Sequence, residues 1–190
     1  MKISLDKKGM PAQLLGHTRN DLPVFFKEMG YKVGAEIGVY KGDYSRLFCQ
    51  NGLKMYAIDS WLAYSEYYWL KANQEQMEKE YERAKAKLAP YDCTIIRKTS
   101  MEAVKDFKET LDFVYIDGNH DFKHATEDIW EWSRKVRKGG VVSGHDYWNA
   151  SHTHLCDVKW VVDGLTQALH IRNWYTFGIK DRKLSWMWIK

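Results

Sequence analysis

Short apolar segments alternate with amphipathic or polar segments along most of this 190-residue chain. Parallel neighbours in a sheet need crossover connections, so this alternation predicts a mostly parallel sheet with helices on both faces. The expected strands, chosen for their length and apolar composition, are residues 33–36, 54–58, 94–97, 111–116 and 141–143. The expected helices are residues 43–50, 65–88, 101–107, 125–136 and 158–169.

The carboxyl-terminal part has a different pattern. Two aromatic segments, residues 173–179 and 184–189, flank a short charged sequence, which predicts an antiparallel hairpin. The expected fold is therefore α/β, a doubly wound and mostly parallel sheet of seven strands that ends in this hairpin. We expect one domain over residues 1–190, with a helical segment at residues 1–32 and a lid helix as one interpretation of residues 60–90.

Composition indicates in which compartment the protein acts and which classes of partner it binds. Lysine and arginine are interleaved with acidic residues, so the net charge of +4 gives little support for a nucleic-acid partner. The three cysteines lack metal-ligand spacing and are typical of free thiols in a reducing compartment. No apolar run approaches the roughly 20 residues of a membrane span, and the first residues lack a signal-peptide pattern. We therefore expect a cytoplasmic protein without a membrane or nucleic-acid partner.

Acidic side chains follow four of the expected strands. Glu36, Asp59 and Asp117 end the first, second and fourth strands, and His145-Asp146 follow the fifth. The carboxyl ends of parallel strands lie at one edge of a sheet, where ligands bind in doubly wound folds. Four acidic strand ends at one edge therefore indicate a ligand site rather than a requirement for solubility.

The turn after the first strand is rich in glycine. Gly38 permits a tight turn, and Gly42 allows the next helix to begin close to the sheet. A dinucleotide site has the same layout, and Asp59 lies 21 residues beyond Gly38, as an acid that binds ribose would. Glu36 argues against a dinucleotide, because a carboxylate beside this turn would repel a pyrophosphate. S-adenosylmethionine carries an ammonium and a sulfonium and no phosphate, so the pattern favours that ligand.

Four segments of the chain, in order, are A-E-I-G-V-Y-K-G, Y-A-I-D-S-W, F-V-Y-I-D-G-N-H and G-G-V-V-S-G-H-D. With them the chain resembles the class I S-adenosylmethionine-dependent methyltransferases over nearly its whole length. More narrowly, I-D-G-N-H-D-F followed by K-G-G and H-D-Y is similar to a small-molecule O-methyltransferase subfamily, which includes macrocin-type enzymes and cephalosporin-hydroxylase-like proteins. The resemblance implies a Rossmann-like sheet and methyl transfer to a small-molecule acceptor, at a hydroxyl oxygen.

The resemblance also implies positions for the cofactor. Glu36 and Gly38 would border its methionine part, and Asp59 would accept hydrogen bonds from the ribose hydroxyls. Ser100 and Met101, after the third strand, would lie beside the adenine. The full set of expected cofactor-binding residues is Glu36, Gly38, Tyr40, Gly42, Asp59, Ser60, Trp61, Ser100, Met101, Asp117 and Gly118.

A divalent metal is a further implication of the resemblance. Metal-dependent O-methyltransferases of this fold place an aspartate after the fourth strand and a pair of oxygen ligands after the fifth. Asp117 matches the first, and His145 and Asp146 occupy the pair. The histidine departs from the pattern, because Mg prefers oxygen ligands whereas imidazole suits metals such as Mn or Fe. In the structural alternative, Asp117 bonds backbone and the His145-Asp146 pair caps a helix.

An acceptor hydroxyl must lose or share its proton as it attacks the methyl group in line. His120, three residues after Asp117, is the expected general base, because an ordinary imidazole pKa suits proton removal near neutral pH. With Asp117 it forms the expected catalytic pair. The alternative is that His120 is a surface or structural histidine.

Two other functions are compatible with these patterns. The first is other metal-dependent chemistry on the same fold, such as hydroxylation, and the second is a binding module that uses aromatic residues as a protein interface. Aromatic residues are concentrated at residues 61–69, as a lid over the site or as the face by which a helix docks. Trp61 likewise either covers the nucleoside or belongs to the core. The aromatic content also permits a homodimer.

Overall fold

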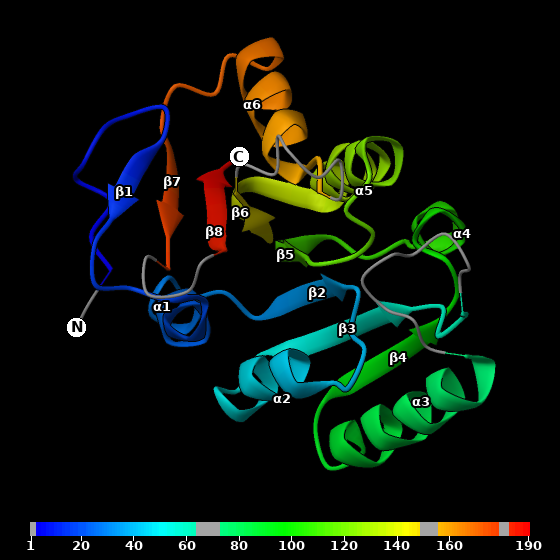
Figure 1. Cartoon of the computed structure of the whole chain (residues 1–190). Coiled ribbons are helices and arrows are strands. Elements are labelled where there is room, and N and C mark those ends of the chain that lie inside the picture. The colour runs from blue at the N-terminus through cyan, green and yellow to red at the C-terminus, as the bar shows by residue number, and fades with distance from the viewer. Residues whose placement is uncertain (1–2, 64–72, 149–155, 179–182) are drawn as a thin grey trace.

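The computed structural model describes residues 3–63, 73–148, 156–178 and 183–190. In this part of the chain eight strands form one sheet, in the order β1-β7-β8-β6-β5-β2-β3-β4 (Figure 1). The strands are β1 (Ala12–Leu14), β2 (Val33–Ile37), β3 (Lys54–Asp59), β4 (Cys93–Arg97), β5 (Leu111–Ile116), β6 (Val136–Tyr147), β7 (Trp174–Phe177) and β8 (Leu184–Ile189). The helices are η1 (Arg19–Asp21), α1 (Leu22–Glu28), α2 (Asp43–Gln50), α3 (Gln74–Leu88), α4 (Ser100–Asp106), α5 (Phe122–Lys135) and α6 (Val158–Ala168).

Strand direction confirms the predicted α/β class. Strand β8 runs antiparallel to both β6 and β7, whereas the other neighbouring pairs are parallel. Strand β2 lies between β3 and β5, and β6 follows β5, so the four strands with acidic ends are consecutive in the sheet. The carboxyl-terminal hairpin is β7 and β8, as predicted.

Helices cover both faces of the sheet (Figure 1). Helices α4, α5 and α6 pack on one face, against apolar side chains that include Ile37, Val114 and Val142. Helices α1 and α2 pack on the opposite face, where Phe26 and Phe48 meet Phe113. Side chains alternate between the two faces along each strand, which is why adjacent residues of β2 and β5 belong to different cores.

Helix α3 lies on the same side as α2 and covers the beginning of the glycine-rich turn. Its buried residues Met77, Ala84 and Leu88 form a third apolar cluster with Val39 and Trp61. A Cβ atom at Gly42 would lie 3.3 Å from the Cα atom of Ala84, so this glycine lets α3 approach the turn closely. The predicted helix of residues 65–88 is confirmed from Gln74 onward, and residues 65–72 lie outside the described part.

Two parts of the sheet differ from the prediction. The amino-terminal segment contributes an eighth strand, β1, which pairs with β7, before its expected helix begins at Leu22. The second difference is β6, which runs through Gly139 and Gly140 instead of starting after them. Gly139 donates a backbone hydrogen bond to Lys190 and Lys190 donates one to Gly140, so β8 holds these glycines inside the strand. None of the described helices is long and apolar enough to span a membrane.

Gly34 in β2 leaves space for the ring of Phe113 in β5, and this contact generates a stability prediction. A Cβ atom at Gly34 would lie 2.1 Å from that ring, in a fully buried layer. We expect Gly34→Ala to lower the free energy of unfolding by about 1–3 kcal/mol through overpacking. Gly164→Ala is the matched control, because among the described residues no atom outside the adjoining turns of its own helix lies within 4 Å of a Cβ there, and alanine favours the helix by about 1 kcal/mol. Urea denaturation measures both; equal midpoints for the two variants would contradict the prediction.

Candidate functional site

The carboxyl ends of β2, β3, β5 and β6 lie side by side at one edge of the sheet. Glu36 is the penultimate residue of β2 and Asp59 is the last residue of β3. Asp117 directly follows β5, while His145 and Asp146 are near the end of β6. The structure therefore brings together the five strand-end residues that the sequence placed at this edge.

The turn after β2 touches the loop that follows β5. Gly38 has a φ of +86°, and a Cβ atom there would lie 2.2 Å from the carbonyl oxygen of Asp117. The N–H of Gly38 donates to Ile58 of β3 and the N–H of Asp117 donates to Ile37 of β2. Glycine is required at residue 38 for two reasons, the backbone angle and the close approach. The glycine turn is thus packed directly against the acidic residue of the neighbouring strand.

Asp59 fastens the glycine turn to β3. One oxygen of its carboxylate accepts the backbone N–H groups of Val39 and Tyr40, each at 2.9 Å, and the other accepts the N–H of Trp61 at 2.9 Å. Consecutive backbone N–H groups in such a turn are the donors that bind phosphate in phosphate-binding loops. Here a carboxylate of the protein already uses them, which argues against a phosphate ligand at this turn.

Glu36, next to the turn, is buried against α2. Its carboxyl group is 2% exposed and accepts a hydrogen bond from the Ser45 hydroxyl of α2. Burial raises the pKa of Glu36 to about 8, although the bond from Ser45 and the charge of Arg19 oppose that rise. Glu36 is therefore mainly neutral at pH 7, and its charge cannot be what discriminates against phosphate. The argument against a phosphate ligand therefore rests on Asp59, whose carboxylate already accepts the N–H groups of the turn. Contact of Glu36 with the cofactor stays a prediction.

Trp61 belongs to the core and does not cover a ligand site, which is the second of the two interpretations given for it above. Its side chain is fully buried and stacks edge-on against Tyr81 of α3, with the ring centroids 5.0 Å apart. The indole N–H donates to the carbonyl oxygen of Tyr40 at 2.8 Å. Trp61 therefore ties the glycine turn to α3 and presents no face to a ligand in this structure. Residues 64–72 of the predicted lid segment 60–90 lie outside the described part.

A cavity of about 460 Å³ opens beside Asp59, over the ends of β3 and β4. Its lining residues are Ser60, Leu62, Arg97, Lys98, Thr99, Glu102, Lys105 and Asp106. The predicted adenine neighbours Ser100 and Met101 begin α4 next to this cavity, and Ser100 accepts a hydrogen bond from the indole of Trp132 at 2.8 Å. The volume is within the range of small-molecule sites.

Asp128 of α5 is a buried acid that sequence reasoning missed. Its side chain would lie 2.9 Å from a Cβ atom at Gly118, one of the predicted cofactor residues. Burial raises the pKa of Asp128 to about 7, and a hydrogen bond with Ser100 opposes the rise. The sequence could have revealed Asp128 through the helical period, which places it on the same face as the buried residues Ala125, Ile129 and Trp132.

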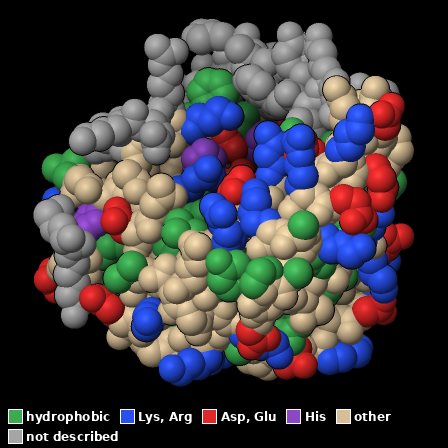
Figure 2. Space-filling view, turned by 90° about the horizontal axis from the view of Figure 1, so that it is seen from below, with side chains coloured by type: hydrophobic (Ala, Val, Ile, Leu, Met, Phe, Trp, Pro, Cys, Tyr) green, Lys and Arg blue, Asp and Glu red, His purple; other side chains and the backbone are tan. Residues whose placement is uncertain are grey.

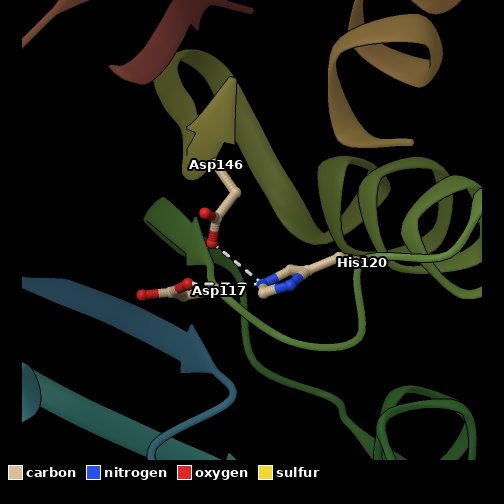
Figure 3. Close-up of side chains that lie close together, drawn as sticks. All are labelled: Asp117, His120 and Asp146. Carbon is tan, nitrogen blue, oxygen red and sulfur yellow. Dashed lines mark ion pairs between the residues drawn. The ribbon is translucent and has the colours of Figure 1, made fainter. Parts of the chain in front are cut away.

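Asp117, His120 and Asp146 point toward one another across the ends of β5 and β6 (Figure 3). The Nε2 atom of His120 lies 2.9 Å from Oδ2 of Asp146 and 3.9 Å from Oδ1 of Asp117. His145 faces the same two oxygens, with its Nδ1 atom 3.3 Å from Asp146 and 3.8 Å from Asp117. Asp146 has a φ of +58°, a conformation that is costly for a residue other than glycine and that often occurs at functional sites.

The other oxygen of each carboxylate is bound by a cation that sequence reasoning did not select. Nη1 of Arg19, in η1, lies 3.1 Å from Oδ2 of Asp117, and Nζ of Lys183, just before β8, lies 2.9 Å from Oδ1 of Asp146. Figure 2 shows histidine and acidic side chains gathered among lysine and arginine side chains on one face of the molecule. No sequence pattern joins Arg19 to Asp117, since the two are 98 residues apart.

The cluster changes the expectation for His120. Burial opposes protonation of the ring, but the two carboxylates outweigh that cost and raise the pKa of His120 to about 9. The same contacts hold the pKa of Asp146 well below its usual range against the effect of burial. In this arrangement His120 is a protonated donor at neutral pH, whereas a general base must be neutral. Its role as the base stays a prediction.

The donor set fits a divalent transition metal. One ligand atom from each of Asp117, His120 and Asp146 lies within 4.8 Å of the others, and Nδ1 of His145 faces the same carboxylate oxygens. Two imidazole nitrogens with two carboxylate oxygens suit Mn, Fe or Zn better than Mg. His120 therefore joins the predicted set of Asp117, His145 and Asp146 as a fourth candidate ligand.

Comparisons with known proteins identify the family and the fold of the chain. A family described as a methyltransferase domain matches residues 35–147, which is more than half of the chain. No curated protein matches the chain. Among solved structures, an O-methyltransferase from Bacillus cereus in complex with SAH is 12% identical, with 90% of this chain and 80% of that chain covered and a TM-score of 0.66.

Two further structures with different activities share the fold. The O-methyltransferase TomG from Streptomyces achromogenes, involved in tomaymycin synthesis and in complex with SAM, is 13% identical, with coverage of 90% and 78% and a TM-score of 0.66. An rRNA methylase from Streptococcus thermophilus is 13% identical, with coverage of 93% and 98% and a TM-score of 0.64. The chain therefore belongs to the methyltransferase-domain family and has the fold of the class I S-adenosylmethionine-dependent methyltransferases.

Proposed function

We propose that the protein transfers a methyl group from S-adenosylmethionine to a hydroxyl oxygen of a small molecule, with a divalent metal at the strand-end carboxylates. The observation that carries the proposal is the packing of Gly38 against Asp117. It makes the glycine turn, where the cofactor would bind, continuous with the only Asp–His–Asp group found among the described residues. A methyl donor and an acceptor oxygen would therefore lie close enough to react.

Binding of the cofactor would use the turn and the cavity beside it. Asp59 uses three acceptor positions of its carboxylate on backbone N–H groups, and a carboxylate has about four, so one remains for a ribose hydroxyl. The nucleoside would extend over Ser60 toward Ser100 and Met101, and the methionine part would lie along Gly38 and Tyr40 toward Asp117 and Gly118. The absence of phosphate from S-adenosylmethionine fits a turn whose N–H groups are already bonded.

Catalysis would depend on orientation and proton transfer. In-line displacement gains most of its rate from holding the acceptor oxygen and the methyl carbon in one geometry. Asp117, Asp146, His120 and His145 would hold the metal, which when bound lowers the pKa of a coordinated hydroxyl. Asp146 holds the imidazole of His120 beside the two carboxylates through its 2.9 Å contact, and the His120 side chain is only 14% exposed.

A second function is favoured by one specific observation, the pair of histidines in the cluster. Imidazole nitrogens with carboxylate oxygens are also the ligands of non-haem iron sites that activate oxygen. Metal-dependent hydroxylation on this fold is therefore the alternative proposal. The two functions differ in what they consume, since a methyltransferase converts S-adenosylmethionine to its demethylated product and a hydroxylase reduces oxygen.

Asp59→Ala tests the cofactor proposal. The change leaves the N–H groups of Val39, Tyr40 and Trp61 without their acceptor, at a cost of about 1–3 kcal/mol for each buried donor. We expect the affinity for S-adenosylmethionine, measured by calorimetry, to fall at least tenfold. Glu75→Gln on the exposed surface of α3 is the control, and we expect it to bind as the parent does. Failure of the parent to bind S-adenosylmethionine would refute the proposed function.

Glu36→Gln tests the pKa of the buried carboxyl group. Its pKa is about 8 in the folded protein and 4.5 in the unfolded chain, so the folded state binds the extra proton between these values. The stability that neutral Glu36 contributes is therefore complete below pH 4.5 and is lost as the pH rises toward 8. The glutamine variant lacks this loss. We expect its free energy of unfolding to gain on the parent steadily from pH 5 to pH 8, and a constant difference would contradict the assigned pKa.

Removal of ligand carboxylates tests the metal site. We expect the parent to bind one Mn²⁺ ion in a calorimetric titration, and Asp146→Ala to lower that affinity about 100-fold, because Asp146 faces both imidazoles. Asp106→Asn, an exposed acid outside the cluster, should bind as the parent does. Metal analysis of the purified protein then separates the two functions: bound iron with oxygen consumption would favour hydroxylation, whereas chelator-sensitive formation of demethylated cofactor supports methyl transfer.

A further inference from the structure

The charges of Asp117 and Asp146 are balanced by two cationic side chains of the protein. Asp117 and Asp146 contribute two negative charges, and Arg19 and Lys183 contribute two positive charges at 3.1 and 2.9 Å. The sulfonium of the proposed cofactor would add one positive charge, and a divalent ion would add two more. The occupied site would therefore carry an excess of positive charge.

The two cations are held in position by aromatic rings. The guanidinium of Arg19 lies over the ring of Tyr44 at 5.2 Å, and the Tyr44 hydroxyl donates to the carbonyl oxygen of Arg19 at 2.6 Å. The ammonium of Lys183 lies over the ring of Trp148 at 6.0 Å. Cations that are fixed in advance lose little conformational freedom when a ligand binds.

The existing ion pairs do not prevent these cations from binding an anion. Arg19 and Lys183 are 37% and 38% exposed, so each faces solvent as well as its carboxylate. Their carboxylate partners are less exposed, Asp117 at 24% and Asp146 at 4%, so we expect both ion pairs to persist when a ligand binds. A guanidinium has five N–H donors in a planar arrangement that matches carboxylate and phosphate, so Arg19 can contact Asp117 and a ligand together.

We propose that Arg19 and Lys183 are specificity-determining residues that select an acceptor carrying a carboxylate or phosphate group. The inference rests on the proposed function for the place of the cofactor and extends it to the class of acceptor. The two residues approach from opposite ends of the chain, η1 and the start of β8, and their partners Asp117 and Asp146 belong to one cluster. An anionic group between them offsets the excess charge, whereas a neutral acceptor of the same shape leaves it unopposed.

The test compares three phenols that differ in one substituent. The probes are 4-hydroxybenzoate, 4-hydroxyphenyl phosphate and the neutral 4-hydroxybenzamide, each titrated calorimetrically into protein saturated with SAH and Mn²⁺. We expect at least one anion to bind the parent tenfold or more tightly than the amide, with the advantage shrinking as salt is added. The tighter of the two anions identifies carboxylate or phosphate as the preferred group.

Matched variants locate the effect. In the double variant Arg19→Gln/Lys183→Gln the advantage of the anions over the amide should disappear, while Arg19→Lys/Lys183→Arg should keep it. Lys79→Gln, which removes an equally charged residue from an exposed pair on α3, should leave the preference unchanged. Thermal unfolding and SAH binding are measured on each variant, so that loss of folding is recognised and the charge-conserving variant decides the question.

The outcomes distinguish this inference from the proposed function. A parent that fails to bind SAH refutes the proposed function. A parent that binds SAH but binds the amide as tightly as both anions, or binds neither anion, overturns the role of Arg19 and Lys183 alone. Retention of the full anion preference in the glutamine double variant overturns it as well.

Discussion

The hydrogen bonds from the turn after β2 to Asp59 are the constraint on which the rest of the site depends. By accepting the N–H groups of Val39 and Tyr40, the carboxylate fixes the path of the turn, and that path brings Gly38 into contact with Asp117. Trp61 secures the same turn from the other side through its bond to Tyr40. One aspartate thereby couples the end of β3 to the chemistry expected at the end of β5, without touching the reacting groups.

Much of this arrangement could be predicted because it follows from local patterns. The apolar run of β5 ends in Asp117, and the parallel topology implied by the alternating segments places that residue beside Glu36 and Asp146. The argument from the charge of Glu36 was wrong, because alternation along β2 turns Gly34 and Glu36 to the face of α2, away from Ala35 and Ile37, where burial raises the pKa of the carboxyl group. Strand β1 was missed because three residues are too few to show a period.

Arg19 and Lys183 could not be predicted for a different reason. Each lies in a polar stretch that would be ordinary on a solvent-exposed surface, and its meaning depends on a partner far away in the chain. The histidines were found by their proximity to Asp117 and Asp146 in sequence, but their protonation depends on distances that the sequence does not contain. The cofactor could be predicted from the resemblance to methyltransferases. The raised pKa of His120 and the ion pairs of Asp117 and Asp146 with Arg19 and Lys183 could be recognised only in the folded chain.

The position of β8 has a consequence for the order in which the molecule is built. This last strand lies between β6 and β7 and forms antiparallel pairs with both, and the indole of Trp186 donates to the carbonyl oxygen of His145 at 3.0 Å. Residues 184–189 are synthesised after residues 1–147, so β6 can pair with β8 only after β2, β3, β5 and β6 itself have been made. The half of the site on β2 and β3 can form early, whereas the half that carries His145 and Asp146 is completed only when the end of the chain folds back.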